Sequence, residues 1–347
     1  MNGFNTNSLV RVLAVLVLGL GTGVRSEAEE IKVAWSVWTG WMPFKLIEDQ
    51  GFLKKRAESL GVEVRLIEFK GYMDSVQAFA AGKVDACAMT SMEALQPASS
   101  GIPTTAVIVN DISHGGDGLL LRNGMEIADI KGQKVLLEQF SVSHYLLNRA
   151  LEINGLSEKD VRVVNIPGDD AGKAFLTDDS VKAVATWNPH LFLANESGKG
   201  KVVFSSQDIP NEIIDLLVFN SKVIDENRLA VEAVVLAWFD AMAMIENKST
   251  RPQAVRIMAE GAGASVEEFE KMLGGTRLFT KPEMTSKFFN SNKLQSTMSR
   301  IRNFSYSNGL ITDKDFKFGF PEKLDGLLNF DPSFVGSEKI QPQGSKP

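Results

Sequence analysis

The sequence predicts an α/β protein of two lobes, each a doubly wound, mostly parallel sheet, and two observations carry this expectation. Short apolar strands alternate with helices, an order that is typical of parallel sheets covered by helices. The alternation occurs twice, before residue 90 and again between residues 134 and 187, which indicates two similar units in tandem. A length of 347 residues fits two domains, each large enough to bury its own core.

The first unit begins at residue 31. Its strands and helices are expected in the order 31–38, 43–55, 62–69, 74–81 and 84–89. Pro43 suits the first turn of a helix because that position needs no amide donor, and Gly82 suits a helix end. These signals predict a strand–helix–strand–helix–strand order.

The second unit repeats this order, and a helical region follows it. Strands and helices are expected at 134–137, 143–153, 161–166, 171–176 and 181–187. From Asp225 onward the pattern is almost purely helical, with expected helices at 229–245, 252–258, 265–273 and 281–290. No third sheet is needed.

Two connections predict a hinge of two crossing strands. Apolar strands at 104–109 and 119–121 flank a polar, Gly-rich segment, and an isolated strand at 216–219 precedes the helical region. If the chain crosses near 111–118 and returns near 216–221, the helical region packs back on the first unit. The expected domains are a first lobe of residues 29–115 plus 221–331, a second lobe of residues 116–220, and a flexible tail of residues 332–347.

The N-terminal residues predict export. Residues 9–20 are apolar but too short for the roughly 20 residues of a membrane-spanning helix. Ser26 and Ala28 offer a small-residue cleavage site, so residues 1–28 are expected to be a signal peptide, with an uncleaved anchor as the alternative. Because no cysteine lies near this site to carry a lipid, we expect a free periplasmic protein.

Composition argues against several classes of function. The net charge is −6 with no basic run, so no nucleic-acid partner is expected. The single cysteine, Cys87, cannot form an intramolecular disulfide, and the three histidines are too far apart for zinc-ligand spacing. A Gly-rich phosphate loop, a G-x-S-x-G elbow and an H-E-x-x-H motif are all missing, so we expect neither an enzyme nor a cofactor or metal.

Several segments resemble one family of transport proteins. Residues 38–44 (WTGWMPF) and 48–55 (EDQGFLKK) resemble the opening of the nitrate/sulfonate/taurine-type periplasmic solute-binding proteins of ABC transporters. The segments AAGKVDA (80–86), SHYLL (143–147) and WNPH (187–190) continue the resemblance, although Asn188 stands where many relatives have an acidic residue. Within the family, TSMEAL (90–95) and NDISHGGDG (110–118) look most like the branch associated with urea carboxylase and guanidine-utilisation genes.

The resemblance implies a fold and a role. The expected fold is the type II periplasmic binding protein fold, in which two lobes close on a small solute by hinge motion. The expected partners are that solute and a cognate inner-membrane ABC permease, and the expected oligomeric state is a monomer. A sensory domain that reports ligand to a membrane partner is a rival, as is an enzyme like the thiamin-pyrimidine synthases, which the single cysteine disfavours.

The candidate ligand-binding residues are acids and tryptophans. Ligands of open α/β sheets sit beyond the carboxyl ends of strands, and the residues that follow the expected strands there are Trp38, Trp41, Asp74, Glu93, Asp111, Asp117, Glu138 and Trp187. Carboxylates and indole faces suit a planar nitrogen-rich solute such as guanidinium, or the similar urea. An anion such as nitrate or taurine would instead need donors and positive charge, and Lys70 is the only cation nearby.

Each candidate also has a structural interpretation. Glu93 follows Thr90 by three residues, as in a capping box, and Asp74 suits the first turn of a helix. Asp111 and Asp117 flank a Gly-rich turn where aspartate is common, and the three tryptophans could belong to the core. Both interpretations stay open at the level of sequence.

Overall fold

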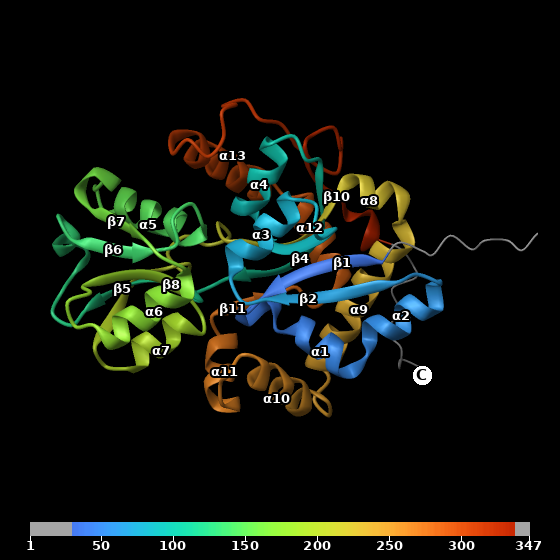
Figure 1. The fold of residues 1–347 in the computed structure, drawn as a ribbon, viewed down its shortest axis with the longest axis horizontal. Coiled ribbons are helices and arrows are strands. Elements are labelled where there is room, and N and C mark those ends of the chain that lie inside the picture. The colour runs from blue at the N-terminus through green and yellow to red at the C-terminus, as the bar shows by residue number, and fades with distance from the viewer. Residues whose placement is uncertain (1–29, 337–347) are drawn as a thin grey trace, which may run out of the picture.

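The computed structural model describes residues 30–336, which form two lobes, each built on one β-sheet (Figure 1). The predicted signal peptide and residues 337–347 of the predicted tail lie outside the described residues. The two-lobed α/β architecture that the sequence predicts is confirmed. Within residues 30–336, no helix combines the length and hydropathy that a membrane crossing needs.

The larger sheet has the strand order β12-β13-β4-β10-β3-β1-β2, with β11 paired to β4. Its strands are β1 (Ile31–Ser36), β2 (Val64–Phe69), β3 (Ala86–Thr90), β4 (Thr104–Ser113), β10 (Ile214–Asn220), β11 (Thr276–Leu278), β12 (Phe318–Gly319) and β13 (Leu328–Phe330). The helices of this lobe are α1 (Pro43–Gln50), α2 (Phe52–Leu60), α3 (Tyr72–Ala80), α4 (Ser91–Ser99), α8 (Ser221–Glu226), α9 (Arg228–Glu246), α10 (Arg251–Gly261), α11 (Val266–Leu273), α12 (Pro282–Phe289) and α13 (Asn292–Ser307).

The smaller sheet has the order β7-β6-β8-β5-β9. Its strands are β5 (Asp117–Arg122), β6 (Lys134–Leu137), β7 (Arg162–Asn165), β8 (Ala183–Trp187) and β9 (Gly200–Ser205). Figure 1 shows α5 (Val142–Ile153) on one face of this sheet, with α6 (Gly168–Thr177) and α7 (His190–Glu196) on the other. The second lobe therefore has the helix–sheet–helix layers that alternating strands and helices predict.

The chain passes between the lobes twice. The outward passage, residues 114–116, joins β4 to β5, and the return, residues 206–213, joins β9 to β10. The sequence placed the return at 216–221, but β10 lies inside the first sheet, antiparallel to both β3 and β4. Its side chains are buried on both faces, which is why it reads as a continuous apolar run.

Two further expectations differ from the structure. The helix expected at 43–55 is two helices, because Gly51 adopts a left-handed conformation (φ 64°) between α1 and α2. Residues 332–336 of the expected tail are packed against the lobe, since Phe334 and Val335 are buried and the Arg228 guanidinium lies 4.2 Å from the Phe334 ring centre. Cation–π attraction thus holds this part of the chain against α9.

The core of the first lobe is aromatic on the side of α1 and α9. The Phe44 ring lies between the two fully buried indoles, 6.1 Å from Trp35 and 5.0 Å from Trp238, measured between ring centres. Arg56 of α2 donates two hydrogen bonds, each of 2.7 Å, to the carboxylate of Asp240 on α9. The helical region therefore packs back on the first unit, as predicted.

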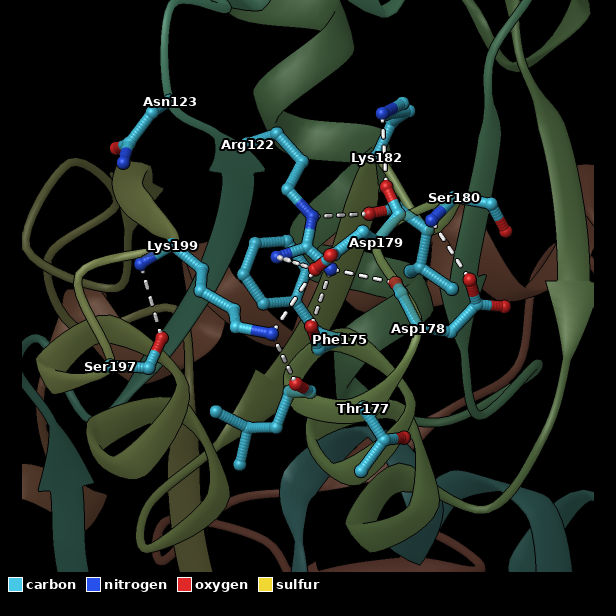
Figure 2. A network of polar contacts seen from close by, with 12 residues as sticks. Arg122, Asn123, Phe175, Thr177, Asp178, Asp179, Ser180, Lys182, Ser197 and Lys199 are labelled. Atoms are coloured by element: carbon cyan, nitrogen blue, oxygen red, sulfur yellow. Dashed lines mark hydrogen bonds and ion pairs between the residues drawn. The ribbon is translucent and has the colours of Figure 1, made fainter.

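One polar network fixes the far end of the second lobe (Figure 2). The buried Arg122 guanidinium donates to the carbonyls of Phe175 (2.5 Å), Asp178 (2.7 Å) and Val181 (2.8 Å) and lies 3.9 Å from the Phe175 ring centre. The last carbonyls of a helix lack partners within the helix, and Arg122 supplies them for α6. The network thereby joins α6 to β5, which ends with Arg122.

Replacing this arginine should destabilise the second lobe. Arg122→Met keeps the aliphatic stem but leaves three carbonyls without their donor, so we expect the free energy of unfolding to fall by about 3 kcal/mol. Thermal unfolding followed by circular dichroism measures this as a lower Tm. The control Lys201→Met removes only the exposed pair with Glu126 and should cost less than about 1 kcal/mol. Equal Tm values for the two variants would contradict the assignment.

Candidate functional site

A small cavity lies between the lobes, beside the two hinge passages. Its lining residues are Ser36, Trp38, Trp41, Tyr72, Thr90, Asp117, Val142, Trp187 and Asp215. Four of the predicted site residues are among them: both N-terminal tryptophans, Asp117 and Trp187. Only about 20 Å³ is open to the centres of water-sized molecules, which is room for about one water, so a larger solute requires the lobes to move apart.

Aromatic rings form one wall of the cavity. The Tyr72 ring lies 5.4 Å from Trp41 and 5.8 Å from Trp187, with the second pair edge to face. Trp187 belongs to the second lobe and the other rings to the first, so this contact crosses the cleft. The tryptophans are nearly buried, as the core interpretation expects, and they also line the cavity; their contact with a ligand stays a prediction.

Glycines set the position of two indoles. A side chain at Gly168 would place its Cβ 2.0 Å from the Trp187 ring, and one at Gly116 would lie 2.4 Å from the Trp38 ring. Such distances are far inside van der Waals contact, so any larger residue would displace the indole. The backbone of α6 and of the outward hinge passage therefore supports the aromatic wall directly.

Two aspartates face each other behind and beside this wall. Asp111 on β4 and Asp215 on β10 are register partners on adjacent antiparallel strands, so their side chains lie next to each other on one face of the sheet. The Trp38 indole N–H donates to the Asp111 carboxyl, with Nε1 3.3 Å from each oxygen. Asp215 lines the cavity, and its Oδ2 is buried without a hydrogen-bond partner.

Burial controls the charge of these groups. It raises the pKa of Asp111 to about 7, opposed by its hydrogen bonds to Asp215 and Trp38, and raises the pKa of Asp215 further because Asp111 lies beside it. Burial likewise raises the pKa of Asp117 to about 7, with a hydrogen bond from Ser113 acting in the opposite direction. No lysine or arginine among residues 30–336 lines the cavity to compensate these carboxylates.

Glu93 joins the lobes instead of facing the cavity. Its Oε1 accepts from the Val142 N–H, the first amide of α5, at 2.7 Å across the cleft. Its other partners are the Thr90 hydroxyl and the Tyr72 hydroxyl, which itself accepts from the Thr90 N–H at 2.9 Å. The expected capping box is not formed, because the Thr90 N–H donates to the Tyr72 hydroxyl and not to Glu93. The Thr90 side chain still caps α4 by accepting from the Met92 N–H, and the contact with Val142 gives Glu93 an interlobe role.

Besides Glu93 and Asp111, two more predicted site residues do not line this cavity. Asp74 is exposed in the first turn of α3, as its structural interpretation expects. Glu138 lines a separate, wider groove of about 470 Å³ between α3, α4 and the second lobe. Burial raises the pKa of Glu138 to about 7, and its Oε2 lacks a partner.

The structure adds lining residues that the sequence did not indicate. Asp215 is the second residue of β10, a strand that the sequence pattern placed at a hinge crossing. Tyr72 is the first residue of α3, which was expected to begin two residues later. Ser36 ends β1, so its position just before Trp38 could have pointed to it. Among residues 30–336, no group of His, Cys, Asp or Glu side chains is arranged to hold a metal ion.

Comparisons with known proteins identify relatives of this chain. A family model described as the NMT1-like family matches residues 25–259. Two curated relatives are described as putative aliphatic sulfonates-binding proteins. The one from Bacillus subtilis (strain 168) is 24% identical over 254 residues, covering 66% of this chain and 76% of the relative. The one from Escherichia coli (strain K12) is 23% identical over 292 residues, covering 83% and 87%.

Solved structures agree in fold. The alkanesulfonate-binding protein SsuA from Xanthomonas axonopodis pv. citri bound to MOPS has a TM-score of 0.69 and 16% identity, covering 83% of this chain and 96% of that chain. The desulfurization enzyme DSZB also has this fold, with a TM-score of 0.57 and 14% identity over 82% of this chain and 94% of that chain. The relatives agree with the resemblance to the sulfonate type, but they do not support the narrower urea carboxylase and guanidine branch.

The raised pKa of Asp117 predicts a pH dependence of stability. A carboxyl group with a higher pKa in the folded state binds more protons when folded, so stability falls as pH rises from about 4 to about 7, by roughly 1.4 kcal/mol per pH unit for each such group. Asp117→Asn removes one such group. Between pH 5 and pH 8 the Tm of this variant should therefore fall less than that of the wild type, measured without ligand.

The matched control is Asp225→Asn, which changes an exposed acid on α8. Its Tm should follow the wild-type pH profile. An Asp117→Asn profile parallel to that of the wild type would show that Asp117 keeps an ordinary pKa.

Proposed function

Because the chain belongs to the NMT1-like family, we propose that it is the solute-binding component of an ABC importer and captures a small, planar, nitrogen-rich cation between its lobes. The importer role is supported by relatives described as sulfonate-binding proteins. Periplasmic binding proteins for sulphonate and for nitrate have a similar fold, and they support a periplasmic location and a cognate membrane permease as partner. The predicted signal peptide at residues 1–28 agrees with export.

One observation favours a cation as the ligand. The buried carboxyl groups of Asp117 and Asp215 line the cavity, and no lysine or arginine within residues 30–336 lines it. A guanidinium ion donates paired hydrogen bonds to a carboxylate and stacks on aromatic rings, where cation–π attraction is worth up to about 2 kcal/mol when desolvated. Asp215 Oδ2 and the Asp117 carboxyl are the available acceptors. The rings of Trp41, Tyr72 and Trp187 supply the stacking surfaces.

The size of the cavity does not by itself choose the ligand. About 20 Å³ holds roughly one water molecule, so guanidinium, urea and alkanesulfonates all require the lobes to move apart before they enter. Urea has nearly the same shape as guanidinium but no charge, so it would leave the carboxylates uncompensated. Charge therefore distinguishes these two solutes.

Closure of the lobes would enclose the ligand. Contacts between the lobes already exist around the cavity: Glu93 with Val142, Tyr72 with Trp187, and the Gln96 side chain with the Phe140 carbonyl at 3.0 Å. Rotation at the passages 114–116 and 206–213 would separate them and open the cleft, as in other hinge-closing binding proteins. The closed form would then be the one that docks on the permease.

An organic sulfonate is the second candidate, because both curated relatives are described as aliphatic sulfonates-binding proteins. The starts of α3, α4 and α5, which carry Tyr72, Thr90 and Val142, all meet at the cavity, and helix N-termini favour anions. However, Glu93 accepts from the first amide of α5, and the Thr90 hydroxyl accepts from the Met92 amide of α4. At the starts of these two helices the chain's own side chains therefore occupy amides that an anion would need.

Calorimetric titration at matched ionic strength tests the proposal, with guanidinium chloride, urea, methanesulfonate and nitrate as ligands. Saturable binding of guanidinium without binding of either anion is the expected result. Binding of methanesulfonate but not guanidinium would overturn the cation and establish the second candidate.

A substitution locates the binding site. At pH 8, Asp215→Asn should weaken guanidinium binding by roughly 10- to 100-fold, the scale of a lost charge-assisted hydrogen bond. The control Asp225→Asn alters an exposed acid on α8 and should bind like the wild type. If both variants bind guanidinium equally well, the ligand does not contact Asp215.

A further inference from the structure

The positions of Asp111 and Asp215 favour a proton shared between them. The two residues are register partners on β4 and β10, so their side chains lie next to each other on one face of the sheet, and both are at most 2% exposed. Two ionised carboxylates so placed would repel each other, and a proton on one of them removes this repulsion and allows it to donate to the other.

The surroundings of the pair offer no other source of positive charge. The titratable groups that act on it are Asp117 of β5, Glu93 of α4 and the fully buried Tyr72 of α3, none of which can become cationic. The Trp38 N–H is the one donor from a neighbouring element that the structure gives Asp111. Two adjacent carboxylates would therefore stand as uncompensated buried charges.

One oxygen of the pair is left without a hydrogen-bond partner. Asp215 lines the cavity, and its Oδ2 is buried and accepts no hydrogen bond. A solute with N–H donors can complete the hydrogen bonding of this oxygen, and a positive charge on the solute can replace the charge of the proton. The raised pKa values of both aspartates agree with a proton that is held near neutral pH and released when a cation arrives.

We infer that the Asp111–Asp215 pair determines ligand charge by exchanging its shared proton for the cationic solute. The bond that breaks is the O–H bond of the protonated carboxyl group. The proton leaves to solvent, and the cation takes its place as the positive charge between two carboxylates. This inference rests on the proposed function, since it requires a cation to bind in this cavity.

The exchange separates solutes of the same shape. Guanidinium brings the charge that allows the proton to leave, whereas urea finds a protonated pair and gains only hydrogen bonds between neutral groups, which are about half as strong. The exchange also ties affinity to pH, because protons compete with the cation for the same pair.

The experiment is calorimetric titration of guanidinium at a fixed pH of 6.5 in three buffers whose ionisation enthalpies differ widely. The slope of the observed enthalpy against the buffer enthalpy gives the protons released per ligand bound. We expect about one proton per guanidinium in the wild type. We also expect affinity to rise about tenfold per pH unit from pH 5.5 and to level off above the apparent pKa of the pair.

The variant Asp215→Asn supplies the second readout. It lacks the shared proton, so its proton release should fall below half a proton per ligand, and its affinity deficit relative to the wild type should shrink as pH is lowered from 8 to 5.5. Circular dichroism establishes that the variant is folded. The control Asp225→Asn should release the same number of protons as the wild type.

Each outcome decides a different question. Guanidinium binding with an enthalpy that is independent of the buffer would overturn the proton exchange and leave the proposed function intact, and this test needs only the wild type. Wild-type proton release that persists in Asp215→Asn would assign the proton to another group and overturn the role of the pair. Failure of guanidinium to bind at all would overturn the proposed function and the exchange together.

Discussion

The cavity depends on one electrostatic constraint, the burial of carboxyl groups beside a space that no described lysine or arginine enters. A buried carboxylate is costly unless a proton, a donor or a cation compensates it. The Trp38 N–H and a shared proton do this for Asp111. Gly40 leaves room for the Asp111 carboxyl group, because a Cβ at this position would lie 2.0 Å from an Asp111 oxygen. The local structure thus accommodates the acids but leaves Asp215 Oδ2 without a hydrogen-bond partner.

Much of the fold follows from local sequence signals, and the departures come from long-range packing. The strand at 134–137 is found as predicted, and α9 matches its apolar pattern to within a residue at each end. The position of β10 between β3 and β4 could not be predicted, because an apolar run does not specify its partners. The same applies to Phe334, whose partner Arg228 lies more than a hundred residues earlier in the chain.

For the site, the sequence predicted some of the residues that line the cavity and not others. The rule that ligands lie beyond strand ends located Trp38, Trp41 and Trp187. It could not exclude Asp74 or Glu138, because strand position does not fix the direction of a side chain. Asp215 was missed because its strand was taken for a hinge crossing, so its register with Asp111 was hidden. Pairing between strands brings these two acids together, and pairing is a property of the folded chain.

The cavity is divided unevenly between the lobes. Most lining residues, including Asp215 and the ring of Tyr72, belong to the first lobe, while Asp117, Val142 and Trp187 come from the second. If the cavity binds a solute as proposed, the solute can dock on the first lobe before the second lobe covers it. Capture would then have two kinetic steps, with an observed rate that levels off at high solute concentration, where closure alone limits it. Because Asp117, one of the two lining carboxyl groups, belongs to the second lobe, closure would add to recognition as well as to retention.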